Sequence, residues 1–102
     1  MPDPKQVKRN KETRGSILKT LEMTYPTPML LENVQRDLPR YGVPGQTDIG
    51  PHVDYLKYKG YIVLTDADEK VFGDAGPMQL LKLTPKGIDL LEETITDLGV
   101  VI

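Results

Sequence analysis

The stretch that most constrains the fold is residues 47–64, "TDIGPHVDYLKYKGYIVL", in which a helical pattern passes into a strand pattern at a glycine. Its apolar residues recur at the spacing of one buried helix face, namely Ile49, Val53 and Leu56. Gly60 suits the helix end, because glycine enters the left-handed conformation without penalty. The β-branched and aromatic run after it is typical of a strand. The sequence therefore predicts a helix over 48–59, capped by Asp48, that continues directly into a strand.

Two more helices are expected before this one. The first covers residues 8–23, and its buried face consists of Ile17, Leu18, Leu21 and Tyr25. Gly15 lies inside this pattern and weakens the helix, which indicates a neighbouring backbone at close range. The second begins near Pro28 with Thr27 as its N-cap and ends before Pro39.

The remaining elements follow the strand of residues 61–65. An acidic, glycine-containing stretch predicts a loop, "QLLKLT" predicts a second strand, and residues 84–98 predict a helix capped by Thr84 with Pro85 first. The expected order is helix, helix, helix, strand, strand, helix.

The size and composition are those of one small domain. The chain has 102 residues and no cysteine, and residues 1–102 show neither a repeat nor a linker. No apolar run is long enough to span a membrane, and the first residues lack the apolar centre of a signal peptide. We therefore expect one domain in the cytoplasm, with no membrane partner.

Positive charge is concentrated near the amino end, although the formal net charge is -2. The cluster consists of Lys5, Lys8, Arg9, Lys11 and Arg14. We expect residues 1–10 to form a flexible basic arm. Such an arm is either a solvated, frayed terminus or a means of holding nucleic-acid phosphates.

Two phrases, "HVDYLKYKGYIVL" and "LKLTPKGIDLL", resemble segments of MarR-, PadR- and ArsR-like regulators. In those proteins a recognition helix ends in glycine, an aromatic residue and isoleucine, and the second wing strand closes on a "LT-x-x-G" phrase. Short winged-helix proteins of Mu-like phages have a similar length and ending. The resemblance implies an α+β winged helix-turn-helix with a two-stranded wing, and the function of a small DNA-binding transcription regulator.

The resemblance and the positive charges together suggest a DNA interface. Helix 48–59 would enter the major groove of double-stranded DNA, with His52 and Tyr55 at the usual contact positions. The full set of expected contacts is Lys8, Arg9, Lys11, Arg14, Thr47, His52, Tyr55, Lys59 and Lys70. The wing is a departure from the family pattern, because Lys70 stands among acidic residues.

Other roles remain open. The outer face of helix 48–59 is expected to present Pro51, Asp54, Tyr55 and Tyr58, and Pro51, Tyr55 and Tyr58 could dock a protein partner without DNA. The apolar tail, residues 98–102, either folds back on the core or joins a second copy in a homodimer. Catalysis, a metal site and a cofactor are not expected, because one histidine and no cysteine or phosphate-binding loop are present.

Overall fold

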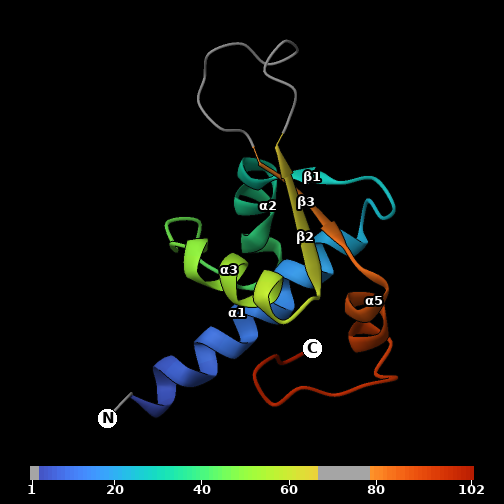
Figure 1. Ribbon diagram of the computed structural model, residues 1–102. Helices are drawn as coiled ribbons and strands as arrows, with labels where there is room; N and C mark the ends of the chain where they lie inside the picture. Colours follow the sequence, from blue (N-terminus) through green and yellow to red (C-terminus); the bar gives the residue numbers. More distant parts are fainter. Residues whose placement is uncertain (1–2, 67–78) are drawn as a thin grey trace.

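The computed structural model describes residues 3–66 and 79–102. Its elements in chain order are α1 (Pro4–Glu22), β1 (Met29–Leu30), α2 (Leu31–Asp37), the 3-10 helix η1 (Leu38–Tyr41), α3 (Gly50–Tyr58), β2 (Ile62–Asp66), β3 (Gln79–Leu83) and α5 (Pro85–Leu91) (Figure 1). The α+β class is confirmed. The sheet is antiparallel with strand order β1-β3-β2, so β1 is an addition to the two strands predicted.

Helix α1 begins earlier than predicted. The Asp3 carboxylate accepts a hydrogen bond from the Lys5 amide at 3.0 Å, and Pro4 occupies the first helical turn, where its missing N–H costs nothing. Residues 4–10 are therefore helical, and the prediction of a flexible arm over residues 1–10 is wrong for them. The helix also ends at Glu22, so Tyr25 lies beyond the buried stripe and is 44% exposed rather than in the core.

The second predicted helix is shorter than expected because its first residues join the sheet. Met29 and Leu30 pair with Leu81 and Leu80 of β3, and α2 starts only at Leu31. Thr27 is therefore not its N-cap. β2 pairs with the other edge of β3, from Ile62 opposite Leu83 to Asp66 opposite Gln79.

The change from α3 to β2 occurs at Gly60, as predicted. Gly60 has a φ of 83°, and the Tyr61 amide donates to the Leu56 carbonyl at 3.0 Å. Thr84 fastens this turn to the last helix, because its hydroxyl donates to the Gly60 carbonyl at 2.6 Å and accepts from the Gly87 amide at 3.1 Å. Thr84 is thus the predicted N-cap of α5. That helix ends at Leu91, not near residue 98.

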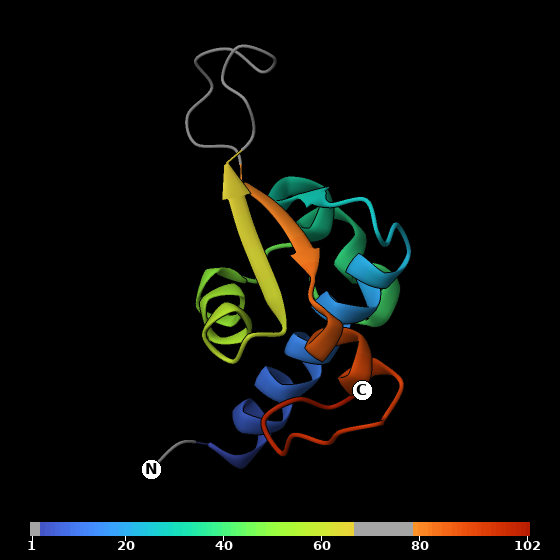
Figure 2. The ribbon, with the colours of Figure 1, turned by 45° about the vertical axis from the view of Figure 1, so that its right-hand side comes forward.

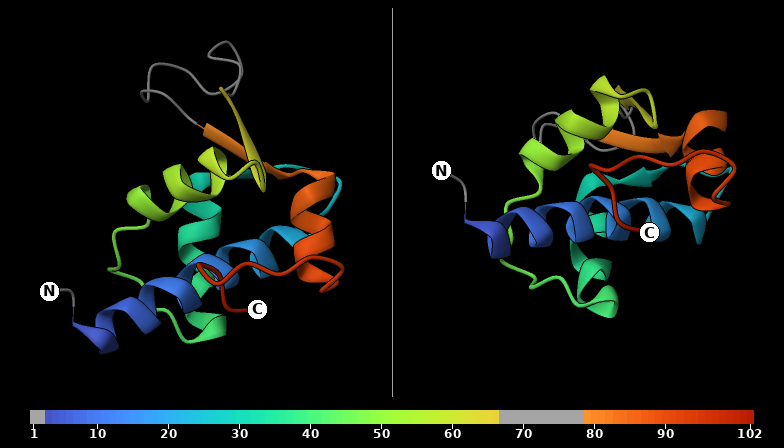
Figure 3. Two further views of the ribbon diagram at one scale, coloured as in Figure 1. Left: turned by 60° about the horizontal axis from the view of Figure 1, so that its bottom comes forward. Right: turned by 90° about the horizontal axis from the view of Figure 1, so that it is seen from below.

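The core lies between the sheet and the helices. Helix α1 is its central element and packs against α2, α3, α5 and β3. In Figure 2 most of α1 lies below the strands β2 and β3, and in Figure 3 α1 runs the length of the domain below α3. The side chains that are fully or almost fully buried include Ile17, Leu18, Val34, Leu38, Leu56, Ile62, Leu81 and Leu90.

The segment after α5 folds back along α1 (Figure 3). The Val101 amide donates to the Lys11 carbonyl at 3.0 Å, and Val100 is 6% exposed. A Cβ on Gly15 would overlap the carbonyl oxygen of Val101. The close backbone expected at Gly15 is confirmed, and it belongs to the chain's own apolar tail.

Candidate nucleic-acid interface

Helix α3 is fixed in the fold by the residues predicted for its inner face. Ile49 at its N-cap, Val53 and Leu56 are at most 3% exposed. The helix begins one residue later than expected, at Gly50, and Asp48 stabilises its start by accepting a hydrogen bond from the Gly50 amide at 3.0 Å. This arrangement leaves an outer face that is exposed at Pro51, Asp54, Lys57 and Tyr58.

Tyr55 does not share that outer face, contrary to the prediction. Its ring is half-buried and packs against the core, and the Arg14 guanidinium stacks on it with 3.8 Å between Cζ and the ring centroid. Arg14 is held in place because its Nη1 donates to the Gly99 carbonyl at 3.0 Å. The C-terminal segment therefore fixes Arg14 on Tyr55, a contact that no local sequence pattern indicates.

Lys59 belongs to the same cluster. Its Nζ lies 3.4 Å from Asp97 Oδ2 and 5.8 Å from the Tyr55 ring centroid. Arg14, Tyr55 and Lys59 were predicted as DNA contacts, and all three already interact with one another or with the C-terminal segment. We call these three residues, with Asp97, the stacked cluster.

Asp97 joins the stacked cluster to Tyr61, the residue that precedes β2. It accepts a short hydrogen bond from the Tyr61 hydroxyl and another from the Gly99 amide at 2.7 Å. Burial raises the pKa of Asp97, but these hydrogen bonds and the nearby Lys59 outweigh burial and leave that pKa below its ordinary value. Burial, followed by the bond to Asp97, raises the pKa of Tyr61 to about 12. Asp97 is therefore a carboxylate and Tyr61 a neutral phenol at neutral pH.

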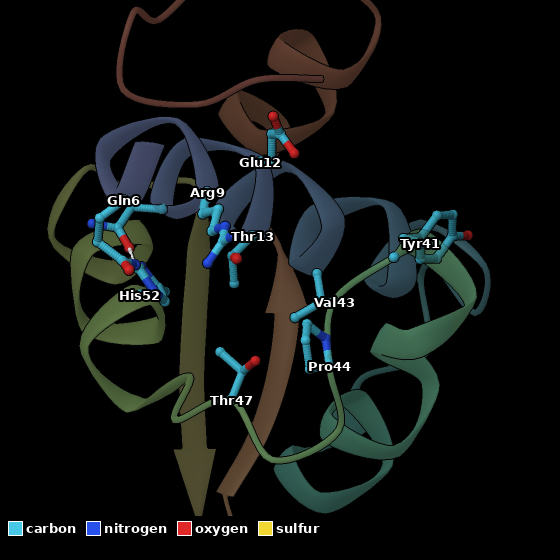
Figure 4. A pocket seen from close by; sticks show the side chains of 11 residues that line it. Gln6, Arg9, Glu12, Thr13, Tyr41, Val43, Pro44, Thr47 and His52 are labelled. Carbon is cyan, nitrogen blue, oxygen red and sulfur yellow. Dashed lines mark hydrogen bonds between the residues drawn. The ribbon is translucent and has the colours of Figure 1, made fainter. Parts of the chain in front are cut away.

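A second group of predicted contacts lies on a groove between α1 and the segment that precedes α3. Arg9 of α1, Thr47 and His52 of α3 line this groove, whose volume is about 510 Å³ (Figure 4). Lys8 is exposed on the same helix, and Lys11 is half-buried there. The structure thus divides the predicted site into a groove group and the stacked cluster.

The other groove residues were missed in the sequence, among them three uncharged polar residues of α1. Gln6, Asn10 and Thr13 line the groove from successive turns of α1. Asn10 and Thr13 lie within the helix predicted for residues 8–23, and the pair Asp3–Pro4, a cap followed by a favoured first residue, indicates the earlier start that adds Gln6. With that start, the three residues fall on one helix face.

His52 is buried where an exposed contact was expected. It is 9% exposed, and its Nδ1 has no hydrogen-bond partner among the described residues. Burial and then the charge of Arg14 lower its pKa below 6.5, and Asp48 opposes them. The folded protein therefore holds a neutral imidazole.

This burial makes folding stability depend on pH. His52 is the one histidine of the chain, and its pKa is lower in the folded state than in the unfolded state. The unfolded chain takes up a proton first as the pH falls, so the stability contributed by the neutral imidazole is complete above about pH 7 and declines from about pH 6.5 downward. We expect the free energy of unfolding in urea to fall between pH 7 and pH 5. In His52→Gln this decline should disappear, and an equal decline in the variant would contradict the assignment.

Lys70 and the acidic residues 68, 69 and 74 of the predicted wing lie outside the described residues. Among the residues that are described, no group of three or more histidine, cysteine, aspartate or glutamate side chains could hold a metal ion. None of the described helices has the length and apolar character needed to cross a membrane.

Comparison of the chain with protein-family models, with curated proteins and with solved structures gives no match.

Proposed function

We propose that this protein is a winged-helix DNA-binding protein and acts as a small transcription regulator. The observation that supports the proposal most is the position of Lys5, Lys8 and Arg9. They are exposed on the first turns of α1, and Arg9 shares a groove with His52 of α3 and with Thr47, which precedes that helix. Cations that are ordered beside an exposed helix can bind backbone phosphates in a fixed register with that helix.

The element order is consistent with a winged helix. Helices α1, α2 and α3 are followed by the antiparallel pair β2–β3, and the short strand β1 extends the same sheet. In this proposal α2 and α3 are the helix-turn-helix, and β2–β3 is the base of the wing.

The proposed reading element is the exposed face of α3. Gly50 and Pro51 give it a narrow tip, and Asp54 can accept from the amino group of cytosine in the major groove. Lys57 and the hydroxyl of Tyr58 can bind phosphates. The buried His52 and the half-buried Tyr55 contribute less in this arrangement than the sequence suggested.

The proposal is tested by fluorescence anisotropy of labelled duplex DNA against salt concentration. One duplex has mixed sequence, and the other comes from the region upstream of the protein's own gene. We expect micromolar or tighter binding, with log K falling against log salt at about 0.9 per phosphate neutralised. Tighter binding to the upstream duplex would support a regulator. No binding to either duplex at low salt would overturn the proposal.

A second candidate is a winged helix that binds protein and not DNA. Tyr58 is 90% exposed on α3, and exposed aromatic side chains are enriched at protein interfaces. Because Tyr55 is half-buried, this surface consists of Pro51 and Tyr58 rather than the three residues predicted. The same titration separates the candidates, since this one requires no DNA binding.

A homodimer remains part of the proposal. It would present two copies of α3 to two half-sites and so raise the affinity of a weakly charged domain. Val100 of the apolar tail is buried in the core of its own chain, but Leu98 and Val101 are 92% and 46% exposed. These two side chains are the residues of the tail that a second copy could cover.

A further inference from the structure

The groove that brings Arg9 and His52 together has the size of a small-molecule site. It lies between the first turns of α1 and the segment of residues 41–47, with His52 at one end (Figure 4). Its volume of about 510 Å³ falls within the range of roughly 300–1,000 Å³ that is usual for such sites.

The walls of the groove differ in character. Arg9, Gln6 and Asn10 give the α1 side cationic and amide groups, while Val43 and Pro44 form an apolar wall on the opposite side. Val43 is 5% exposed and belongs to the core, so this wall is fixed in place. A ligand that fits both walls has one polar end and one apolar end.

His52 supplies a polar group that still needs a partner. The residue is nine-tenths buried, lines the groove, and leaves Nδ1 without a hydrogen bond among the described residues. A buried polar atom without a partner is unfavourable, so a ligand atom bonded to it would remove that cost. An imidazole that is neutral can either donate or accept at this nitrogen.

The charges of the lining limit what the ligand can carry. Arg9 is the cation of the lining, Glu12 is its anion, and His52 is neutral. A phosphate ester with two negative charges would pair with only one guanidinium, that of Arg9, and would be repelled by the carboxylate of Glu12. The lining therefore disfavours such a ligand. A single carboxylate matches the guanidinium fork with two parallel hydrogen bonds.

We infer that this groove binds a small organic monocarboxylate with an apolar body. The carboxylate pairs with Arg9, the body packs on Val43 and Pro44, and a polar substituent bonds to His52 Nδ1. This site goes beyond the proposed DNA interface, and its test contains no DNA, so the two proposals succeed or fail separately.

The test uses three probes with different apolar bodies: cyclohexanecarboxylate, benzoate and hexanoate. Each is titrated into the ¹⁵N-labelled protein, and amide chemical shifts are followed by NMR. We expect at least one probe to bind with a millimolar or lower Kd, as its few non-hydrogen atoms allow, and to shift the amides of residues 6–13 and 41–52. The amide of the binding probe, such as cyclohexanecarboxamide, keeps the shape without the charge and should bind at least tenfold more weakly.

Two variants locate the carboxylate. Arg9→Gln should weaken the binding probe at least tenfold, and the exposed position of Arg9 makes it tolerant of the change. Lys19→Gln removes the same charge from α1 outside the groove and should leave the affinity unchanged. The inference is overturned if no probe shifts the groove amides up to about 20 mM, a concentration at which even weak fragments bind. It is equally overturned if the carboxamide binds as well as the carboxylate, or if both variants weaken binding alike.

Discussion

Reversing Lys8, Arg9 and Lys11 together to glutamate is expected to weaken DNA binding roughly 10²- to 10³-fold at about 0.1 M salt. Each lost phosphate contact removes about 0.9 from the slope of log K against log salt, so the slope should flatten by about 2.7. These side chains lie on the first turns of helix α1, which fixes their positions relative to the DNA backbone. A phosphate that loses its contact with one of them is therefore not bound by a neighbouring side chain instead.

A matched variant separates this effect from net charge. Lys19→Glu, Arg40→Glu and Lys82→Glu together change the charge equally, and none of these three residues lines the groove. Their salt slope should stay close to that of the unaltered protein. Circular dichroism checks that both triple variants are folded. Equal flattening in the two variants would show that binding follows total charge and not the proposed interface.

Deleting residues 98–102 is expected to lower the free energy of unfolding by about 2–4 kcal/mol, the scale for removing a buried aliphatic side chain. Val100 is lost from the core, and Ile102 is lost from its edge. The Lys11 carbonyl and the Arg14 guanidinium lose their partners in the same segment. The measurement is urea unfolding followed by circular dichroism, and Leu98→Ala is the control because Leu98 is 92% exposed.

The substitution Gly15→Ala tests whether residues 98–102 pack on α1. In the full chain, Gly15→Ala should destabilise the protein by about 1–3 kcal/mol, because the added methyl overlaps the Val101 carbonyl. In the shortened chain the same change should stabilise it by up to about 1 kcal/mol, the ordinary preference for alanine within a helix. The same sign in both backgrounds would contradict the packing. Light scattering on the same samples reports whether the tail also holds a homodimer.

The elements whose signals are local could be predicted from the amino-acid sequence alone. The spacing of Ile49, Val53 and Leu56 fixed the inner face of α3, and Gly60 fixed its end, because periodicity and backbone conformation act within a few residues. The cap of α5 at Thr84 followed from the same kind of rule. These residues were predicted correctly without knowledge of what surrounds them.

Which surfaces remain for function depends on contacts between distant parts of the chain. Strand β1 exists because β3 offers a second edge, and Tyr55 is half-buried because Arg14 and the returning C-terminal segment cover it. His52 and Arg9 come from positions far apart in the chain and meet only across the groove. Contacts of this kind depend on long-range packing, which outweighs local preference and leaves no periodic pattern in the sequence.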